Sequence, residues 1–349
     1  MPNTAVLKQI VKRQAKIAIA RGLMLTGQAR RARKAQAQQL RILMYHGVLP
    51  KVRGPAAYGD LFVSAKNFAR QLRHLKLRYN PMSLNEVVAA IKSQTPFPPR
   101  AVAVTIDDGY RNTLTAALPA LSDLRVPATV FVPTDLIGSG RYLWFDCLRL
   151  LVWKAHSTRE RVELAMGILI DGTASLSQEQ HFLALNRRVM ALPAGSRAIV
   201  QQEIQRLTQE KQLLGRFSDF ELATWEELRL AAANGVLSVG SHALAHGDLT
   251  ELDYGQQTQE MRASRERIER ELSLRCDSVA YPYGLWNDNT LKAVREAGYA
   301  CAVTIENGFN GIADDPFRLS RTMAGDKGNF SIFCARLSGT WENLKRINE

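Results

Sequence analysis

The chain has 349 residues, a length that allows one large domain or two ordinary ones. Hydrophobic residues make up 46% and charged residues 23%, which is the composition of a globular protein and excludes a wholly disordered chain. No stretch reaches the roughly 18 uncharged apolar residues that a membrane-spanning helix needs, so a simple transmembrane protein is excluded.

The net charge of +13 is concentrated at the N-terminus. Residues 1–41 hold ten lysines and arginines and no acidic residue, so the rest of the chain carries only +3. That balance argues against a nucleic-acid-binding protein. Apolar residues recur at helical spacing, which predicts a basic amphipathic helix over residues 1–38. Such a helix can bind an anionic membrane surface through residues 1–35, or it can be a solvated arm or pack on its own domain.

The chain has no clear signal peptide, because Arg21 interrupts the apolar stretch at 17–25. The cysteines are far apart and form no CxxC pair, which excludes a disulfide scaffold and a cysteine zinc site. They are Cys147, Cys276, Cys301 and Cys334. We therefore expect a cytoplasmic protein that can lie on the inner face of the membrane.

Strands and helices alternate from residue 39 onwards, as in parallel α/β folds. The first half has expected strands at Arg41–Val48, Ala101–Ile106 and Ala128–Val132, and helices at 67–77, after the capping box at Ser83, and at 113–124. The second half has expected strands at 237–239, 278–281, 299–304 and 317–321, and helices after the capping box at Thr224, at 255–272 and at 289–297.

The Gln-, Arg- and Leu-rich stretch at 147–220 interrupts this alternation and predicts a helical insertion. We therefore expect one α/β domain at 39–335 with that insertion, followed by a tail at 336–349. Polar clusters follow the strands, at the edge where parallel α/β barrels and sheets form active sites.

Three of these clusters can act together: Asp107-Asp108, His242 with His246, and Pro282-Tyr283-Gly284. Each alone is ordinary for a turn. Two histidines and one carboxylate, however, supply the three ligands of a catalytic zinc, and a second carboxylate can accept a proton from water. A turn with an exposed N–H can stabilise an oxyanion. The set predicts metal-assisted hydrolysis of an amide or ester.

The chain resembles the polysaccharide deacetylases with the NodB homology domain, which form carbohydrate esterase family 4. The matching segments are Thr105–Gly109 (TIDDG), Ser241–His246 (SHALAH) and Ala280–Gly284 (AYPYG). The resemblance implies a distorted (β/α) barrel that binds one divalent metal, expected to be zinc. It further implies the following roles: Asp107 as general base, Asp108, His242 and His246 as metal ligands, and the N–H of Tyr283 at the oxyanion.

Two departures from the family pattern need compensation. The family's arginine in the third motif is Ala280 here, and Arg318 or Arg321 is our candidate to orient Asp107 in its place. Most members carry the catalytic acid, a histidine, near the C-terminal end of the domain, but no histidine follows His246 in this chain. His46, after the first strand, resembles the early histidine of members that deacetylate poly-N-acetylglucosamine, and we expect it to be the acid.

The favoured function is removal of N-acetyl groups from amino sugars of a glycan or lipid-linked sugar, by attack of a metal-activated water. The same chemistry would remove a formyl group. The alternative is a non-catalytic glycan-binding or membrane-associated scaffold on the same fold, which the missing arginine at 280 favours. Trp144 or Trp286 could stack on a sugar ring, although core packing is the preferred interpretation for Trp144.

Overall fold

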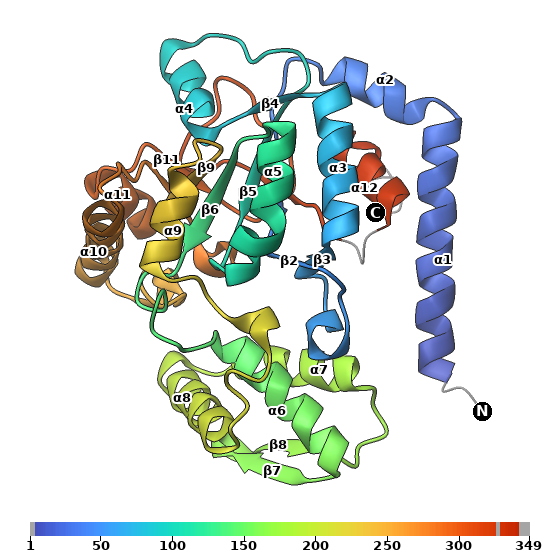
Figure 1. Ribbon diagram of the computed structural model, residues 1–349, viewed down its shortest axis with the longest axis vertical. Coiled ribbons are helices and arrows are strands. Elements are labelled where there is room, and N and C mark those ends of the chain that lie inside the picture. The colour runs from blue at the N-terminus through green and yellow to red at the C-terminus, as the bar shows by residue number, and fades with distance from the viewer. Residues whose placement is uncertain (1–3, 326–328, 342–349) are drawn as a thin grey trace.

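A twisted, mostly parallel β-sheet forms the centre of the computed structural model, which describes residues 4–325 and 329–341 (Figure 1). Seven strands follow in the order β11-β10-β9-β6-β5-β1-β12, and β4 also pairs with β5. Their bounds are β1 Arg41–Tyr45, β4 Asn80–Met82, β5 Ala101–Ile106, β6 Ala128–Val132, β9 Leu237–Ser241, β10 Ser278–Ala280, β11 Cys301–Val303 and β12 Arg321–Met323.

The sheet curls into a nearly closed barrel, as the family resemblance implies. Val303 in β11 forms a parallel bridge with Leu319, which lies just before β12, so the two ends of the strand order approach each other. Helices surround the sheet: α3 Ala65–Arg78, α4 Leu84–Ser93, α5 Leu118–Leu124, α9 Trp225–Ala232, α10 Tyr254–Leu272 and α11 Asp288–Glu296. Because the barrel strands are parallel, their carboxyl ends open on one side, beside β2 Gly47–Leu49 and β3 Phe62–Ser64.

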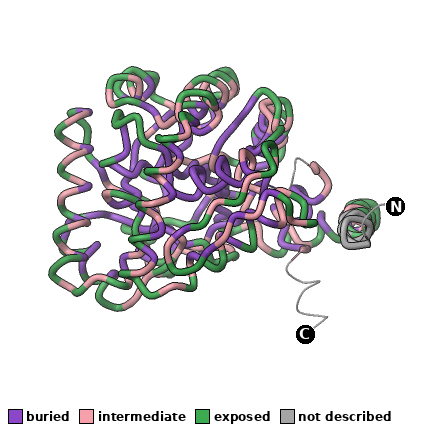
Figure 2. The backbone as a smooth tube through the Cα atoms, turned by 90° about the horizontal axis from the view of Figure 1, so that it is seen from below, coloured by how far each residue is buried: buried purple, intermediate pink, exposed green. Residues whose placement is uncertain are grey.

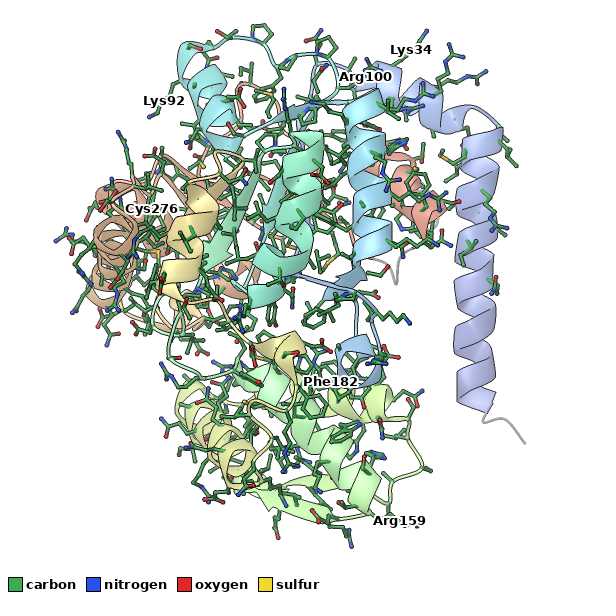
Figure 3. All side chains as sticks on the ribbon, in the orientation of Figure 1. Lys34, Lys92, Arg100, Arg159, Phe182 and Cys276 are labelled. Atoms are coloured by element: carbon green, nitrogen blue, oxygen red, sulfur yellow. The ribbon has the colours of Figure 1, made fainter. Side chains whose placement is uncertain are left out.

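The insertion packs below that open side, and its apolar core is continuous with barrel residues that include Tyr58, Phe62 and Tyr110 (Figures 1 and 3). It contains α6 Trp144–Thr158, α7 Gln178–Met190 and α8 Ala194–Glu210. The insertion is mainly helical, and an antiparallel hairpin, which was not predicted from the sequence, joins α6 to α7. Its strands are β7 Arg161–Leu164 and β8 Ile168–Asp171.

Two helices, not one, precede the barrel. They are α1 Thr4–Leu25 and α2 Gln28–Ala35, and the break lies at Gly27, whose φ of 74° is left-handed. Figure 2 shows α1 end-on beside the body. Its second half packs on α12 Phe330–Leu337, through Ala20 and Leu23 against Ile332 and Ala335.

The expectation that residues 1–35 pack little on the domain is therefore wrong for this part of α1. Of the predicted tail, residues 336–341 continue or follow α12, and residues 342–349 lie outside the described part. No helix in the described ranges has both the length and the apolar character needed to cross a bilayer.

Candidate active site

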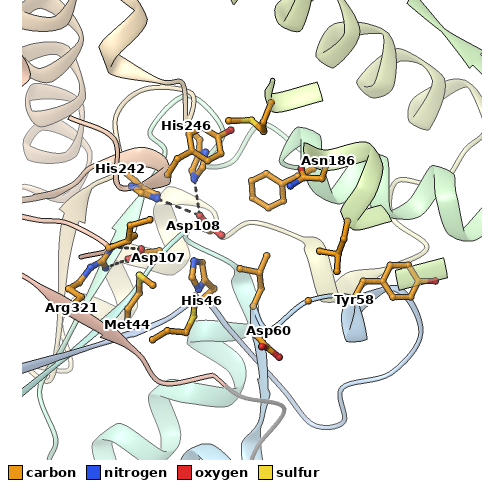
Figure 4. Close-up of a pocket in the computed structure, with 18 of the residues that line it drawn as sticks. Met44, His46, Tyr58, Asp60, Asp107, Asp108, Asn186, His242, His246 and Arg321 are labelled. Atoms are coloured by element: carbon orange, nitrogen blue, oxygen red, sulfur yellow. Dashed lines mark hydrogen bonds and ion pairs between the residues drawn. The ribbon is translucent and has the colours of Figure 1, made fainter. Parts of the chain in front are cut away.

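All of the predicted site residues except Arg318 line one cavity at the carboxyl end of the barrel (Figure 4). Asp107 and Asp108 directly follow β5, and His46 follows β1, which pairs with β5. His242 follows β9, and Tyr283 lies in the turn after β10. Strands that are neighbours in the sheet thus deliver side chains from distant segments to one cavity.

Asp108, His242 and His246 form a buried cluster in which one ligand atom from each lies within 4.8 Å of the others. The Nε2 atoms of His242 and His246 lie 3.6 and 3.3 Å from Oδ1 of Asp108. Nδ1 of His242 lies 2.8 Å from the carbonyl oxygen of Ala280 and donates to it when it carries the hydrogen, which leaves Nε2 free to bind a metal.

The chemistry of this cluster fits a divalent metal. Both carboxylate oxygens of Asp108 are buried, and neither accepts a hydrogen bond from any described residue. Burial raises the pKa of Asp108, but His246, His46 and His242 together lower it below its ordinary value. Burial and the neighbouring His246 lower the pKa of His242 to about 4. The site therefore offers one carboxylate and a neutral imidazole, the protonation states that metal binding needs.

The backbone at Asp108 is adapted to this position. Asp108 has a φ of 73° and Gly109 a φ of 68°, so two successive residues are left-handed. A Cβ at residue 109 would lie 3.0 Å from side-chain atoms of Val132 and Ile137. Glycine therefore fits where the chain turns sharply, and the turn directs the two aspartates to different neighbours.

Asp107 forms a buried ion pair with Arg321. Arg321 donates from Nη1 to Oδ1 at 2.6 Å and from Nη2 to Oδ2 at 2.8 Å. Burial alone would raise the pKa of Asp107, but Arg321 and His242 outweigh it and hold the pKa below its ordinary value. Asp107 is thus ionised and fixed by a two-point contact.

Arg318, our other candidate, lies elsewhere. Its guanidinium carbon lies 4.4 Å from the ring centroid of Trp286, and among the described contacts it forms no ion pair with Asp107. The structure therefore pairs Asp107 with Arg321 and not with Arg318. Arg321 comes from β12, whereas Ala280 is the last residue of β10.

His46 lines the same cavity as the two aspartates. Its Nδ1 is buried and has no hydrogen-bond partner among the residues described. His74, His156 and His181, the histidines outside the proposed site, do not line this cavity. His156 and His181 contact each other in the insertion, with ring nitrogens 2.9 Å apart. His181 is buried.

Tyr283 has a left-handed backbone with a φ of 57°. Its ring packs edge-to-face on His246 with centroids 4.6 Å apart, and its hydroxyl accepts a hydrogen bond of 2.8 Å from Nε1 of Trp144. Burial raises the pKa of the Tyr283 hydroxyl well above its ordinary value, so the group stays protonated. Trp144 is buried, as expected for a residue that packs in the core.

A cavity of about 690 Å³ connects these groups with the insertion. Several side chains of its wall come from α6 and α7, and sequence reasoning did not single them out. They are Phe145, Arg149, Phe182, Leu183, Asn186 and Met190. Helical periodicity identifies the buried face of each helix but not which part of that face meets the barrel. The aromatic start of the insertion, Trp144-Phe145, was the only available signal.

The comparison with known families agrees with this geometry. A family model described as "Polysaccharide deacetylase" matches residues 94–302, which is more than half of the chain. The chain belongs to the polysaccharide deacetylase family. YxkH of Bacillus subtilis (strain 168), a relative named after the same family, is 34% identical over 112 residues. That alignment covers 32% of this chain and about 40% of the length of the relative.

Solved structures support the fold of this polysaccharide deacetylase family member. The Streptococcus pyogenes deacetylase PplD, solved in complex with acetate, is 20% identical, with a TM-score of 0.55 and coverage of 88% of this chain and 97% of that one. IcaB from Ammonifex degensii is 18% identical, with a TM-score of 0.56 and coverage of 86% and 97%. At these identities the similarity concerns the barrel fold.

Proposed function

We propose that this protein is a metal-dependent hydrolase that removes N-acetyl groups from amino sugars of a glycan or lipid-linked sugar. The observation that supports the proposal best is one cavity that holds an Asp-His-His cluster beside an ionised, arginine-fixed aspartate. Family membership and the barrel fold support the same reaction class. PplD, a deacetylase solved with acetate, has the same fold.

Asp108, His242 and His246 would hold the divalent metal, with zinc as the expected ion because two imidazoles and one carboxylate suit it. A divalent metal in such a site lowers the pKa of water and polarises the amide carbonyl. The three side chains leave the cavity side of the cluster open, since the cluster itself lines the cavity. The amide would lie there.

Asp107 is the proposed general base. The two hydrogen bonds from Arg321 keep its carboxylate ionised and limit its rotation, so an oxygen is held ready to accept a proton from water. The N–H of Tyr283 is the proposed donor to the developing oxyanion, because the left-handed turn places this residue at the cavity wall.

His46 is the proposed acid that protonates the leaving amine. Imidazole is suited to this step near neutral pH, and His46 lines the cavity in which the amide would lie. The hypothesis of a non-catalytic scaffold drew its support from Ala280. The contact between Arg321 and Asp107 removes that support, because an arginine does accompany the base.

The test is acetate release from N-acetylglucosamine oligomers with zinc removed by a chelator and then restored. We expect release that disappears on chelation and returns with zinc, and Asp108→Ala should lose both zinc and release. Acetate release that stays the same after a chelator has removed the metal would contradict the proposal.

For the N-terminal segment we propose binding to an anionic membrane surface through residues 1–35, at the inner face of the membrane. The ten basic residues of this end support it. So do exposed apolar side chains on α1: Ile19, Met24 and Leu25. A helix of this composition combines apolar burial in the interface with attraction to anionic lipid.

A further inference from the structure

His246 lacks the hydrogen bond that usually orients a metal-binding imidazole. Its Nε2 faces Asp108 at 3.3 Å, whereas its Nδ1 is buried and has no partner among the described residues. His242 differs, because its Nδ1 contacts the carbonyl oxygen of Ala280. Metal-binding histidines ordinarily donate the second N–H to an acceptor, which fixes the ring. The orientation of His246 must therefore come from packing.

Besides the ring of His242, whose centroid lies 4.6 Å away, two aromatic rings pack against that imidazole. The Tyr283 ring stands perpendicular to it at 90°, with centroids 4.6 Å apart, and the Phe145 ring lies 5.6 Å away at 66°. Edge-to-face contacts of this kind are favourable and directional. Phe145 belongs to the first turn of α6, and its neighbour Trp144 donates the 2.8 Å hydrogen bond to the Tyr283 hydroxyl.

Tyr283 needs such support. It is an L-residue at a φ of 57°, and Gly284 after it has a φ of 71°, where a Cβ would come within 2.2 Å of Ile305. Left-handed conformations of non-glycine residues persist when the surroundings determine them. Trp144 holds the far end of the Tyr283 ring, so one hydrogen bond restrains both the ring beside His246 and the turn that presents the N–H.

The first turn of α6 is itself anchored to the barrel. Asp146 is fully buried and accepts a 2.7 Å hydrogen bond from the hydroxyl of Tyr110, two residues after Asp108. Arg149 lies on the other side of Asp146, with Nε 3.3 Å from Oδ1, and donates to the carbonyl oxygen of Tyr58. The start of the insertion is therefore fixed to the same loop that carries the metal-binding carboxylate.

We propose that Trp144 and Phe145 are positioning residues of the metal site. They hold the Tyr283 ring and one side of His246, and so help to set the direction of a ligand whose Nδ1 has no hydrogen-bond partner among the described residues. The insertion is thus part of the metal site as well as a wall of the cavity. This inference rests on the proposed function, because it assumes that His246 binds the metal.

The test compares Trp144→Phe with Trp153→Phe in the full chain. The first change removes the indole N–H and keeps a ring. The second, a matched control in the same helix, affects a ring that packs on Phe217 at 5.0 Å, away from the cavity. We expect Trp144→Phe to weaken zinc binding on the order of tenfold, measured by competition with a chelator, and Trp153→Phe to leave it within about twofold. The cobalt(II) spectrum should change only in Trp144→Phe.

Tyr283→Phe removes the acceptor and should match Trp144→Phe, and the double variant should be no weaker than either, because both remove one hydrogen bond. Phe145→Leu removes the second ring and tests the packing separately, with a similar loss expected. Zinc affinity and a cobalt spectrum in Trp144→Phe equal to those of Trp153→Phe would overturn the proposal, as would additive losses in the double variant.

The failure of the proposed reaction is distinguishable from failure of this inference. Zinc affinities that fall as predicted in a chain that releases no acetate would support the positioning role and contradict only the reaction. A wild-type chain that binds no zinc would overturn both.

Discussion

An arginine contacts the proposed general base from a position other than the one in the family pattern, since Arg321 pairs with Asp107. The two residues are 214 positions apart, and both are buried. Loss of one partner from a buried ion pair leaves an uncompensated charge and costs about 3–5 kcal/mol. The pair therefore contributes to the fold as well as to the proposed chemistry.

Arg321→Lys should reduce kcat by about tenfold or more and leave zinc binding unchanged. Lysine keeps the positive charge but cannot form the planar two-point contact that orients Asp107. The same change at Arg318, which contacts Trp286, should reduce kcat far less. Steady-state rates of acetate release give kcat for both variants. An equal loss of kcat in Arg321→Lys and Arg318→Lys would contradict the role of Arg321 as the orienting residue.

His46→Ala should reduce the rate by about 10²–10⁴-fold while zinc content stays at the wild-type level. The reason is that His46 lines the cavity but is outside the Asp-His-His cluster. Rates on N-acetylglucosamine oligomers and metal analysis give the two readouts. Normal turnover in His46→Ala would assign the proton donor to another group.

At the scale of elements, much of the barrel could be predicted from local patterns. The run AVAVTI is β5, and all six of its residues are buried, as a continuous β-branched run indicates. Ser83 and Thr224 form the capping boxes of α4 and α9, as predicted. These features depend on neighbours in sequence, which is why the sequence alone reveals them.

The features that could not be predicted depend on distant contacts. In β7 only Leu164 is buried, so this strand of the hairpin has no alternation to detect. Strand β12 begins at Arg321, a buried charge that hydropathy places outside. Its partner Asp107 directly follows β5. Arg318 and Arg321 are both candidates from the sequence for this contact, and no local pattern decides between them. The same holds for Trp144, whose partner Tyr283 is 139 residues away.

Helix α12 is docked on α3 through His74. The His74 ring lies 5.4 Å from the Phe330 ring and 6.4 Å from the Phe333 ring. Burial, reinforced by Arg33 and Arg78, lowers the pKa of His74 from its ordinary 6.5 to about 4. The folded protein therefore favours the neutral ring.

This docking should weaken in acid. Because the pKa of His74 is lower in the folded than in the unfolded chain, its contribution is complete above pH 6.5 and is lost as the pH falls from 6.5 towards about 4. The ring is partly exposed, so we expect a loss on the order of 1 kcal/mol. Urea unfolding at pH 7 and pH 4.5 should show a smaller decline in His74→Leu than in wild type. Equal declines would show that His74 does not contribute.

At the scale of the whole molecule, packed side chains connect helices α1 and α12 with the wall of the cavity. Trp341 lines the cavity and also packs on the cluster formed by α1 and α12. The basic N-terminal end and the proposed active site are thus linked by a short path of packed side chains. An enzyme that acts on a lipid-linked sugar at a membrane surface would benefit from this arrangement.

Replacement of Lys8, Lys12 and Arg13 by glutamine should weaken binding to anionic vesicles and leave acetate release from a soluble oligomer unchanged. Each basic residue near such a surface contributes on the order of 1 kcal/mol, reduced by salt. Co-sedimentation with phosphatidylserine vesicles, with phosphatidylcholine vesicles as control, measures the effect. Undiminished sedimentation of the variant would contradict membrane binding through this segment.

The most direct test of the whole account is one comparison of acetate release and zinc content in wild type and Asp107→Asn. Asp107 is outside the Asp-His-His cluster, so the Asp107→Asn variant should still bind about one zinc per chain but lose nearly all turnover. The account predicts a zinc-loaded, inactive variant beside a zinc-loaded, active wild type. An Asp107→Asn variant that releases acetate at the wild-type rate would contradict it.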